Sequence, residues 1–256
     1  MASAGAIGVL LLLTIAAISI VCLLTGYTWR SYPTLEPSAS VVVAGDTRSL
    51  EELASTFQPQ LFLPEGVDSP PALTMWWEAI DAEDSLALVY HPVWQDERHP
   101  VPVLHWIYYI YRAIVYGVPV RDIEYIQINV NRLDGSIQRI RYEGSSSRSY
   151  EDWVSEHRYV AIDRVGAQYV ATVTTRQNSE PKTRTLRING PQLQFGVATW
   201  SHQLVLLEGS TDQYSELINM PLEHLLEENY VRYKLARRSQ GDFATRDGFI
   251  SVVDRL

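Results

Sequence analysis

The chain of 256 residues has an ordinary globular composition, with 46% hydrophobic and 20% charged residues, and is long enough to bury a sizeable core. Its formal net charge of −9 argues against nucleic acid as the main partner, because phosphate binding needs a basic surface. The one cysteine, Cys22, excludes an intrachain disulfide and a cysteine-based zinc site. The 15 Tyr and 7 Trp residues are typical of a β-rich core, an interface or a membrane border.

The first strong signal is an uncharged apolar run from Ala4 to Leu24. A helix of this length spans about 30 Å, the hydrocarbon thickness of a bilayer. No basic residue precedes Arg30, and the run ends in "LLTGYTW", a poor cleavage site with aromatic residues typical of a membrane border. We therefore expect residues 1–29 to be an uncleaved single-pass anchor that contacts lipid through residues 4–24, with a cleaved signal peptide as the alternative. One arginine leaves the side of the membrane undetermined.

The following residues predict a linker, a short helix and a series of strands. Residues 30–56 begin with the polar, proline-punctuated "SYPTLEPSAS" and contain "SLEE" at Ser49–Glu52, which has the spacing of a capping box. From residue 57 to residue 210, short segments rich in β-branched and aromatic residues alternate with turn signals. This pattern predicts an antiparallel, sandwich-like β domain.

Two segments of this domain carry more specific expectations. "DIEYIQINVN", the "DG" at Asp134–Gly135 and "SIQRIRYEG" predict a hairpin. Because Ile137 and Ile140 do not share parity, we expect a bulge in the return strand. "VLHWIYYIYRAIVYG", residues 103–117, fits a helical face, yet its Ile and Tyr content favours a strand, and we expect extended structure at its start.

The C-terminal residues 211–256 change to a helical period. "DQYSELIN" and "PLEHLLEENYVRYKLARR" read as helices, with an apolar stripe at Leu222, Leu225, Leu226, Tyr230 and Val231. The fold class expected from the sequence is therefore α+β, with an N-terminal transmembrane helix, an antiparallel β-rich domain and C-terminal helices packed on that domain.

An acidic pair lies on the apolar side of the best strand, "RDIEYIQINVN". Residues two apart on a strand point to one face, so Asp122 and Glu124 are expected beside Ile126 and its successors. The two carboxylates could bind one cation or share one proton. The alternative is exposure at the start of the strand, or an ion pair with one of the arginines Arg112, Arg139 and Arg141.

A second group of polar residues lies in "HPVWQDERHP". His91 and His99 from this segment are ligand types for zinc or another divalent ion, with Asp96, Glu97 and the nearby His105 beside them. Their spacing matches no metal-binding signature. A charged surface loop is the alternative interpretation of this segment.

The order "FQPQLFLPEG", "HWIYYIY", "RDIEYIQINVN" and "SIQRIRYEG" resembles the necrosis-inducing-protein-like and vacuolar-sorting-type β-sandwich domains. The resemblance covers about Phe57–Gly144. It implies that Asp122 and Glu124 match the acidic pair of an H-D-W-E type strand, with Ile123 in place of the aromatic residue and Arg121 in place of the histidine. Because arginine cannot ligate a metal, the resemblance implies a sandwich with a degraded metal site.

The sequence contains no phosphate-binding glycine loop, nucleophile elbow or zinc-protease motif. The leading hypothesis is a non-catalytic, membrane-anchored accessory or interaction subunit of a larger membrane assembly, with protein partners and no cofactor. One alternative is a metal-dependent enzyme or metal-binding sandwich that uses the candidate ligands Asp122, Glu124, His91 and His99.

A further alternative is a surface domain that binds a carbohydrate or another ligand through exposed aromatic residues. Clustering of four tryptophans along one groove would favour it, and burial of all four would count against it: Trp76, Trp77, Trp94 and Trp106.

Overall fold

A computed structural model describes residues 34–81, 84–116, 121–145, 150, 157–175, 182–188, 190–208 and 213–232. The expected anchor in residues 4–24 lies outside this part of the chain. Among the described residues, no helix is long and apolar enough to cross a membrane.

The described part is mostly β. Its strands are β1 (Ser40–Val43), β2 (Asp46–Ser49), β3 (Gln60–Pro64), β4 (Ala72–Asp81), β5 (Ser85–Trp94), β6 (Asp122–Ile123), β7 (Ile126–Asn131), β8 (Ile137–Ser145), β9 (His157–Val165), β10 (Gln168–Thr175), β11 (Lys182–Leu186), β12 (Gln194–Val197), β13 (Leu204–Leu206), β14 (Tyr214–Ile218) and β15 (Leu222–His224). Its helices are α2 (Leu50–Thr56), α3 (Pro102–Tyr116) and α4 (Glu227–Arg232).

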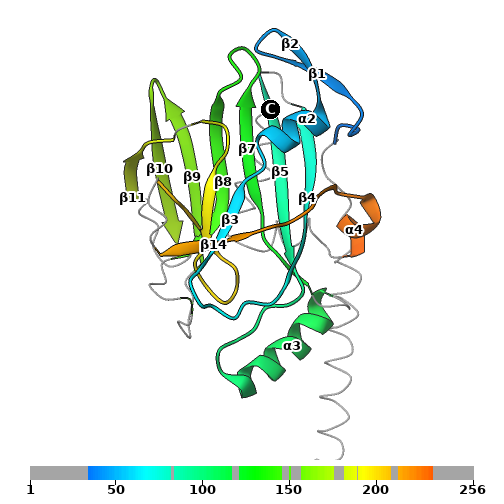
Figure 1. The fold of residues 1–256 in the computed structure, drawn as a ribbon, viewed down its shortest axis with the longest axis vertical. Helices are drawn as coiled ribbons and strands as arrows, with labels where there is room; N and C mark the ends of the chain where they lie inside the picture. Colours follow the sequence, from blue (N-terminus) through cyan, green and yellow to red (C-terminus); the bar gives the residue numbers. More distant parts are fainter. Residues whose placement is uncertain are drawn as a thin grey trace, which may run out of the picture.

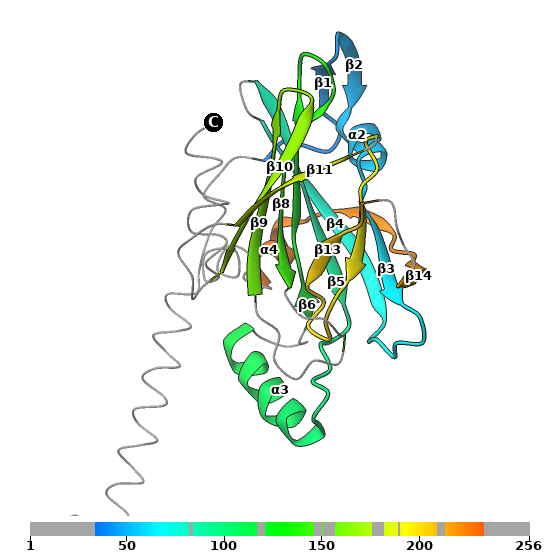
Figure 2. The same cartoon turned by 90° about the vertical axis from the view of Figure 1, so that its left-hand side faces the viewer.

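Thirteen of the described strands form one mixed sheet, in the order β14-β3-β12-β13-β8-β7-β5-β4-β15, with β9, β10, β11 and β6 paired beside this path. The sheet curls around its core (Figures 1 and 2). Most described pairs are antiparallel, but β3 and β12, β8 and β13, and β4 and β15 pair in parallel. The purely antiparallel, sandwich-like domain expected from the sequence is therefore corrected to a curled mixed sheet, because late strands pair with strands far away in the sequence.

The concave side of the sheet holds the main core. Ile126, Ile128 and Val130 are completely buried there, as the alternation of the sequence predicts. Helix α2 covers part of this side with buried Leu50 and Leu53. The side chain of Ser49 accepts a hydrogen bond from the backbone N–H of Glu52, so the predicted helix start is confirmed.

The hairpin of β7 and β8 confirms a second local prediction. Its turn contains Gly135 at φ +70°, a conformation that glycine adopts without strain. Asn129 pairs with Arg139 whereas Val130 pairs with Ile137, so the return strand holds one extra residue. This is the bulge that the unequal parity of Ile137 and Ile140 predicts, and it lets both isoleucines reach the core.

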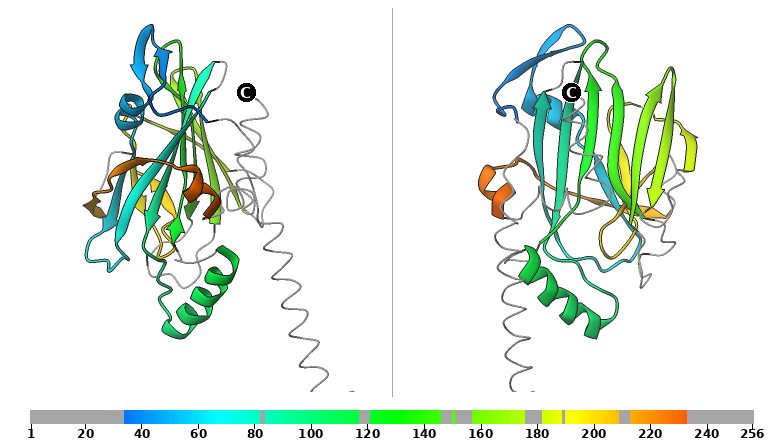
Figure 3. Two further views of the ribbon diagram at one scale, coloured as in Figure 1. Left: turned by 90° about the vertical axis from the view of Figure 1, so that its right-hand side faces the viewer. Right: turned by 180° about the vertical axis from the view of Figure 1, so that it is seen from behind.

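The segment expected to begin as a strand is instead helix α3, which starts at Pro102. It lies beyond one end of the strands (Figure 3). Its amphipathic character is inverted relative to an ordinary surface helix, because Arg112 is 1% exposed whereas Trp106 is 69% exposed. The strand prediction was wrong because it relied on the β-propensity of Ile and Tyr. These residues favour a strand only when a neighbouring strand packs beside them, and this segment has no such neighbour.

The C-terminal segment also differs from the expectation of long helices. Residues 214–218 and 222–224 are strands, and the described helix is limited to Glu227–Arg232. Strand β14 pairs with β3, and β15 pairs with β4, so these two short strands close opposite ends of the main sheet path. Pairing with an otherwise open sheet edge outweighs the helical period of the sequence. Residues 233–256 lie outside the described part.

Candidate functional site

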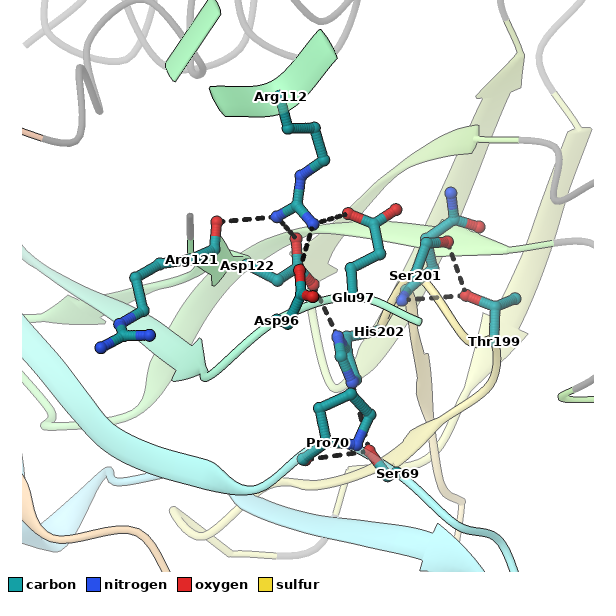
Figure 4. A network of polar contacts seen from close by, with 11 residues as sticks. Ser69, Pro70, Asp96, Glu97, Arg112, Arg121, Asp122, Thr199, Ser201 and His202 are labelled. Atoms are coloured by element: carbon teal, nitrogen blue, oxygen red, sulfur yellow. Dashed lines mark hydrogen bonds and ion pairs between the residues drawn. The ribbon is translucent and has the colours of Figure 1, made fainter. Parts of the chain in front are cut away.

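A buried polar cluster lies at the end of the sheet that faces α3 (Figure 4). Its residues come from five separate segments. Ser69 precedes β4, Asp96 and Glu97 follow β5, Arg112 belongs to α3, Asp122 begins β6, and His202 precedes β13. The fold therefore assembles this cluster from residues that no local sequence motif connects.

Arg112 is the cation of the cluster. Its guanidinium lies 3.1 Å from Asp96, 3.1 Å from Glu97 and 3.5 Å from Asp122. It also donates a hydrogen bond of 2.7 Å to the backbone carbonyl of Arg121. Burial lowers the pKa of Arg112, but the negative charges of Glu97 and Asp122 more than offset this effect, so its pKa is raised. The guanidinium is therefore a permanent positive charge at this position.

The turn between β12 and β13 places His202. The N–H of His202 donates to the carbonyl of Thr199 at 2.9 Å, and the Thr199 hydroxyl accepts from the N–H of Gln203 at 3.1 Å. His202 has φ +54°, a left-handed conformation that is uncommon for residues other than glycine. Its ring stacks on Trp94, with the ring centroids 4.3 Å apart and the planes 6° from parallel. The turn and the indole together fix the orientation of the imidazole.

The two ring nitrogens of His202 have different partners. Nδ1 lies 2.6 Å from Oδ2 of Asp122, and Nε2 lies 3.2 Å from the hydroxyl oxygen of Ser69. His202 and Asp122 are buried, and Ser69 is half-buried. The order serine, histidine, aspartate is the arrangement in which an imidazole can take a proton from a hydroxyl while a carboxylate holds the ring.

The structure separates the candidate metal ligands. Asp122 faces the cluster, where Arg112 supplies the ion pair that the sequence offered as the alternative to a metal. His91 lies on the other side of the sheet and contacts Glu78, with Nε2 3.1 Å from the carboxylate oxygen. His99 accepts a hydrogen bond from the N–H of Val101 through Nδ1.

Glu124 is also buried, directly after β6. Within the described ranges, no group of three or more histidine, cysteine or acidic residues could hold a metal ion. The two histidines and Asp122 therefore do not converge on one centre in this part of the chain.

A pocket of about 460 Å³ opens beside the cluster. Aromatic rings and prolines form much of its wall. Asp68 and Arg98, which form an ion pair of 2.8 Å, also line the pocket. The lining residues are Val67, Asp68, Arg98, His99, Pro100, Pro102, His105, Trp106, Tyr150 and Trp200. The ring of His99 lies against Trp200, with the ring centroids 4.6 Å apart. This wall combines flat apolar surfaces with a few charged and polar groups, as small-molecule sites do.

The four tryptophans that the sequence singled out divide between core and pocket. Trp76, Trp77 and Trp94 are buried, whereas Trp106 is exposed and lines the pocket. The four tryptophans therefore do not cluster along one groove, and they are not all buried. Trp200, which the sequence analysis did not single out, joins Trp106 in the pocket wall.

Sequence reasoning named Asp122 and its partner Arg112, but it missed Ser69 and His202. The only local signal for these two was unusual residue placement: a serine before the Pro70–Pro71 pair, and a histidine at the end of the turn "TWSH". Neither signal specifies a partner, because Ser69 and His202 are separated by 133 positions in the sequence.

No family model and no curated protein matches the chain. The structure resembles the necrosis-inducing toxin fold, as the sequence predicted for Phe57–Gly144, and the similarity extends over 80% of the chain. It is similar to the solved structure of NLPPya in complex with mannosamine (TM-score 0.37, 11% identity, 82% of that chain) and with glucosamine (TM-score 0.37, 12% identity, 82% of that chain). A structure described as a toxin fold for microbial attack and plant defense is similar at TM-score 0.38 and 12% identity over 83% of its chain.

Proposed function

We propose that this chain is a ligand-binding domain that takes a small carbohydrate in the pocket between α3 and the end of the sheet. The observation that carries the proposal is the exposure of Trp106 at this pocket. A tryptophan is usually drawn into a core or an interface, so an indole that stays 69% exposed at a concave site is suited to hold a ligand.

The pocket wall fits the two-sided chemistry of a sugar ring. The C–H face of a pyranose packs against an indole, while its hydroxyl rim needs charged or polar partners. Trp106 supplies an exposed flat apolar surface, and the buried Trp200 adds part of its ring to the wall. Asp68 and Arg98 supply an acceptor and a donor. The volume of about 460 Å³ lies within the range of roughly 300–1,000 Å³ that small-molecule sites occupy.

Calorimetric titration of the full chain with single sugars tests the proposal. The first ligands are glucosamine and mannosamine, the amino sugars in the complexes of the similar structures, with glucose and mannose as neutral counterparts. We expect Trp106→Ala to weaken binding at least about 10-fold, which corresponds to about 1.4 kcal/mol. The matched control is Ile110→Ala, an exposed position of α3 that does not line the pocket. Equal binding by both variants, or no binding of any of the four sugars, would refute the proposal.

A second candidate function is the membrane-anchored interaction subunit. The observation that favours it is the outward side of α3, where Val103, Ile107 and Ile110 are all exposed and none of them lines the pocket. Apolar residues at this spacing form one stripe of a helix, and an exposed apolar stripe is typical of an interaction site. With the apolar run Ala4–Leu24, a partner within a membrane assembly would fit this surface.

Gentle detergent extraction of the native membrane tests this second candidate. We expect the chain to migrate in a larger complex, and we expect the double change Ile107→Ser with Ile110→Ser to release it. Leu133→Ser, at a still more exposed apolar position in the turn after β7, is the control. A chain that always migrates as a lone monomer would contradict the membrane-assembly function without touching the sugar-binding proposal.

A further inference from the structure

We propose that Ser69, His202 and Asp122 form a nucleophile, base and acid triad that transfers the acyl group of a small carboxylic ester to water. The proposal goes beyond sugar binding and does not depend on it. It rests on the two contacts of the His202 ring, 3.2 Å to the Ser69 hydroxyl and 2.6 Å to the Asp122 carboxylate (Figure 4). It also rests on the pocket beside these residues.

The contacts of His202 select one tautomer for the reaction. Since a carboxylate only accepts hydrogen bonds, the nitrogen at 2.6 Å from Asp122 carries the proton. In the neutral ring, Nε2 is then left with a lone pair directed at Ser69. The stacking on Trp94 and the hydrogen bond of the His202 N–H to Thr199 keep the ring from turning away. The left-handed backbone of His202 is a strained feature of the kind that persists at functional sites.

Arg112 holds the carboxylate of the triad. One oxygen of Asp122 contacts His202 and the other contacts Arg112, so the carboxylate is fixed at both ends. Arg112 is fixed in turn by the backbone carbonyl of Arg121 and by Asp96 and Glu97.

Ser69 lies next to the pocket along the chain. Ser69 is half-buried and directly follows Asp68, which lines the pocket together with Tyr150. The Ser69 hydroxyl also lies 3.3 Å from the carbonyl of Pro70. Rotation of the O–H group therefore directs its hydrogen bond either to this carbonyl or to Nε2 of His202. An ester bound in the pocket would therefore lie close to a serine that already contacts its base.

Tyr150 supplies the hydrogen-bond donor that the reaction needs. Its hydroxyl is near Ser69, and within the described part of the chain it is buried without a hydrogen-bond partner. The carbonyl of Tyr150 accepts a hydrogen bond of 3.0 Å from the N–H of Trp200. Burial raises the pKa of Tyr150 to about 12, so its phenol keeps the proton with which it can stabilise an oxyanion.

The proposed reaction balances in two steps. The Ser69 oxygen attacks the ester carbonyl carbon while its proton moves to Nε2 of His202, and the tetrahedral oxyanion accepts the hydrogen bond of Tyr150. The bond to the alcohol oxygen breaks, and the alcohol leaves with the proton from Nε2. Water then attacks the acyl-serine, gives a proton to Nε2, and releases the carboxylic acid as the proton returns to Ser69.

The test uses a fluorophosphonate, which bonds covalently to activated serines, followed by peptide mass spectrometry of the full chain. We expect an adduct on Ser69, and its loss in Ser69→Ala. The matched control is Ser55→Ala, which changes an exposed serine of α2 and is expected to label like the unchanged chain. His202 is completely buried, so its replacement threatens the fold. The labelling of the His202→Gln variant is therefore compared with that of the unchanged chain only if the two melting temperatures agree within a few degrees.

Hydrolysis of p-nitrophenyl acetate gives the second measurement. The expected result is a burst of nitrophenol followed by slower turnover, with a drop of at least about 100-fold in Ser69→Ala, the lower end of what a nucleophile and base contribute. Tyr150→Phe is expected to keep the fluorophosphonate adduct but to slow turnover by about 100-fold. A folded chain without an adduct at Ser69, or a Ser69→Ala variant that hydrolyses the ester as fast as the unchanged chain, would overturn the triad.

Discussion

Nδ1 of His202 lies 2.6 Å from Oδ2 of Asp122, across 80 positions of the sequence. This contact connects the turn between β12 and β13 to the start of β6. Arg112 of α3 contacts the same Asp122 and so connects α3 to both. A pocket wall and the end of the sheet therefore share one buried polar cluster. In such a cluster, removal of one charge leaves its partners uncompensated, so the energetic cost exceeds that of the lost contact alone.

The first prediction concerns Arg112→Met. This change leaves Asp96, Glu97 and Asp122 around a position that no longer carries a positive charge. We expect the free energy of unfolding at neutral pH, measured by urea denaturation, to fall by about 3–5 kcal/mol.

Arg98→Met is the matched control for this experiment. In its ion pair with Asp68, the side chain of Arg98 is 58% exposed and that of Asp68 is 89% exposed. Loss of this pair is therefore expected to lower the free energy of unfolding by less than about 1 kcal/mol. If the two arginine variants lost the same stability, Arg112 would not be the compensating charge of the cluster.

The second prediction concerns the buried contact between His91 and Glu78 on the opposite side of the sheet. Glu78 is fully buried, and its carboxylate lies 3.1 Å from Nε2 of His91. His91→Leu alone is expected to cost about 3 kcal/mol or more, because a carboxylate loses a partner inside the protein. Adding Glu78→Leu is expected to recover most of that loss.

Thermal and urea unfolding of the four chains of this double-mutant cycle measure the coupling between the two residues. Strictly additive losses would show that the pair does not act as a unit. Metal analysis of the same samples adds a second readout, because a metal held by His91 would disappear from the His91→Leu chain.

Local features of the fold could be predicted from the sequence because their causes are local. A serine three residues before a glutamate caps α2, and the Asp134–Gly135 dipeptide makes the turn of the β7–β8 hairpin. The bulge was predictable for the same reason, since it follows from the spacing of Ile137 and Ile140. The resemblance over Phe57–Gly144 was also found from residues that follow one another in the chain.

The elements that were predicted wrongly depend on distant partners. α3 buries Arg112 and exposes Trp106, because the three carboxylates around Arg112 come from other segments. β14 and β15 become strands because β3 and β4 offer them open edges. Likewise, nothing near Ser69 indicates that a histidine 133 positions later will meet its hydroxyl. The pairing of Asp122 with Arg112 was predictable only as one of several arginine alternatives.

The third prediction concerns Gly196 in β12. A Cβ atom at this position would lie 2.5 Å from Cε1 of Tyr214, whose ring reaches across β3 from β14. Gly196→Ala is therefore expected to lower the free energy of unfolding by about 1–3 kcal/mol, through overpacking. Tyr214→Ala in the same chain removes the obstacle, so the double variant is expected to be no less stable than Tyr214→Ala alone. An equal loss in the presence and absence of the tyrosine ring would refute this account.

The fourth prediction concerns Tyr142 at high pH. Its ring is buried against Phe195, and its hydroxyl accepts a hydrogen bond from the N–H of Leu206 at 3.4 Å. Burial raises the pKa of Tyr142 from 10.0 to about 12, although the Leu206 hydrogen bond opposes this shift. Between pH 10 and pH 12 the unfolded chain therefore loses a proton that the folded chain keeps.

A folded-state pKa above the unfolded value means that the contribution to stability is fully present below pH 10 and is lost as the pH rises through about 12. One such proton corresponds to a slope of about 1.4 kcal/mol per pH unit. The Tyr142→Phe chain is expected to have a free energy of unfolding about 1 kcal/mol lower at pH 8, because the N–H of Leu206 loses its acceptor. Above pH 10, its free energy of unfolding is expected to fall less steeply with pH than that of the unchanged chain, and the two slopes are expected to differ by the slope of one proton. Urea denaturation of both chains at intervals from pH 8 to pH 12 measures the difference. Parallel curves would mean that Tyr142 ionises as readily in the folded chain as in the unfolded one, and that its burial does not set the alkaline limit of stability.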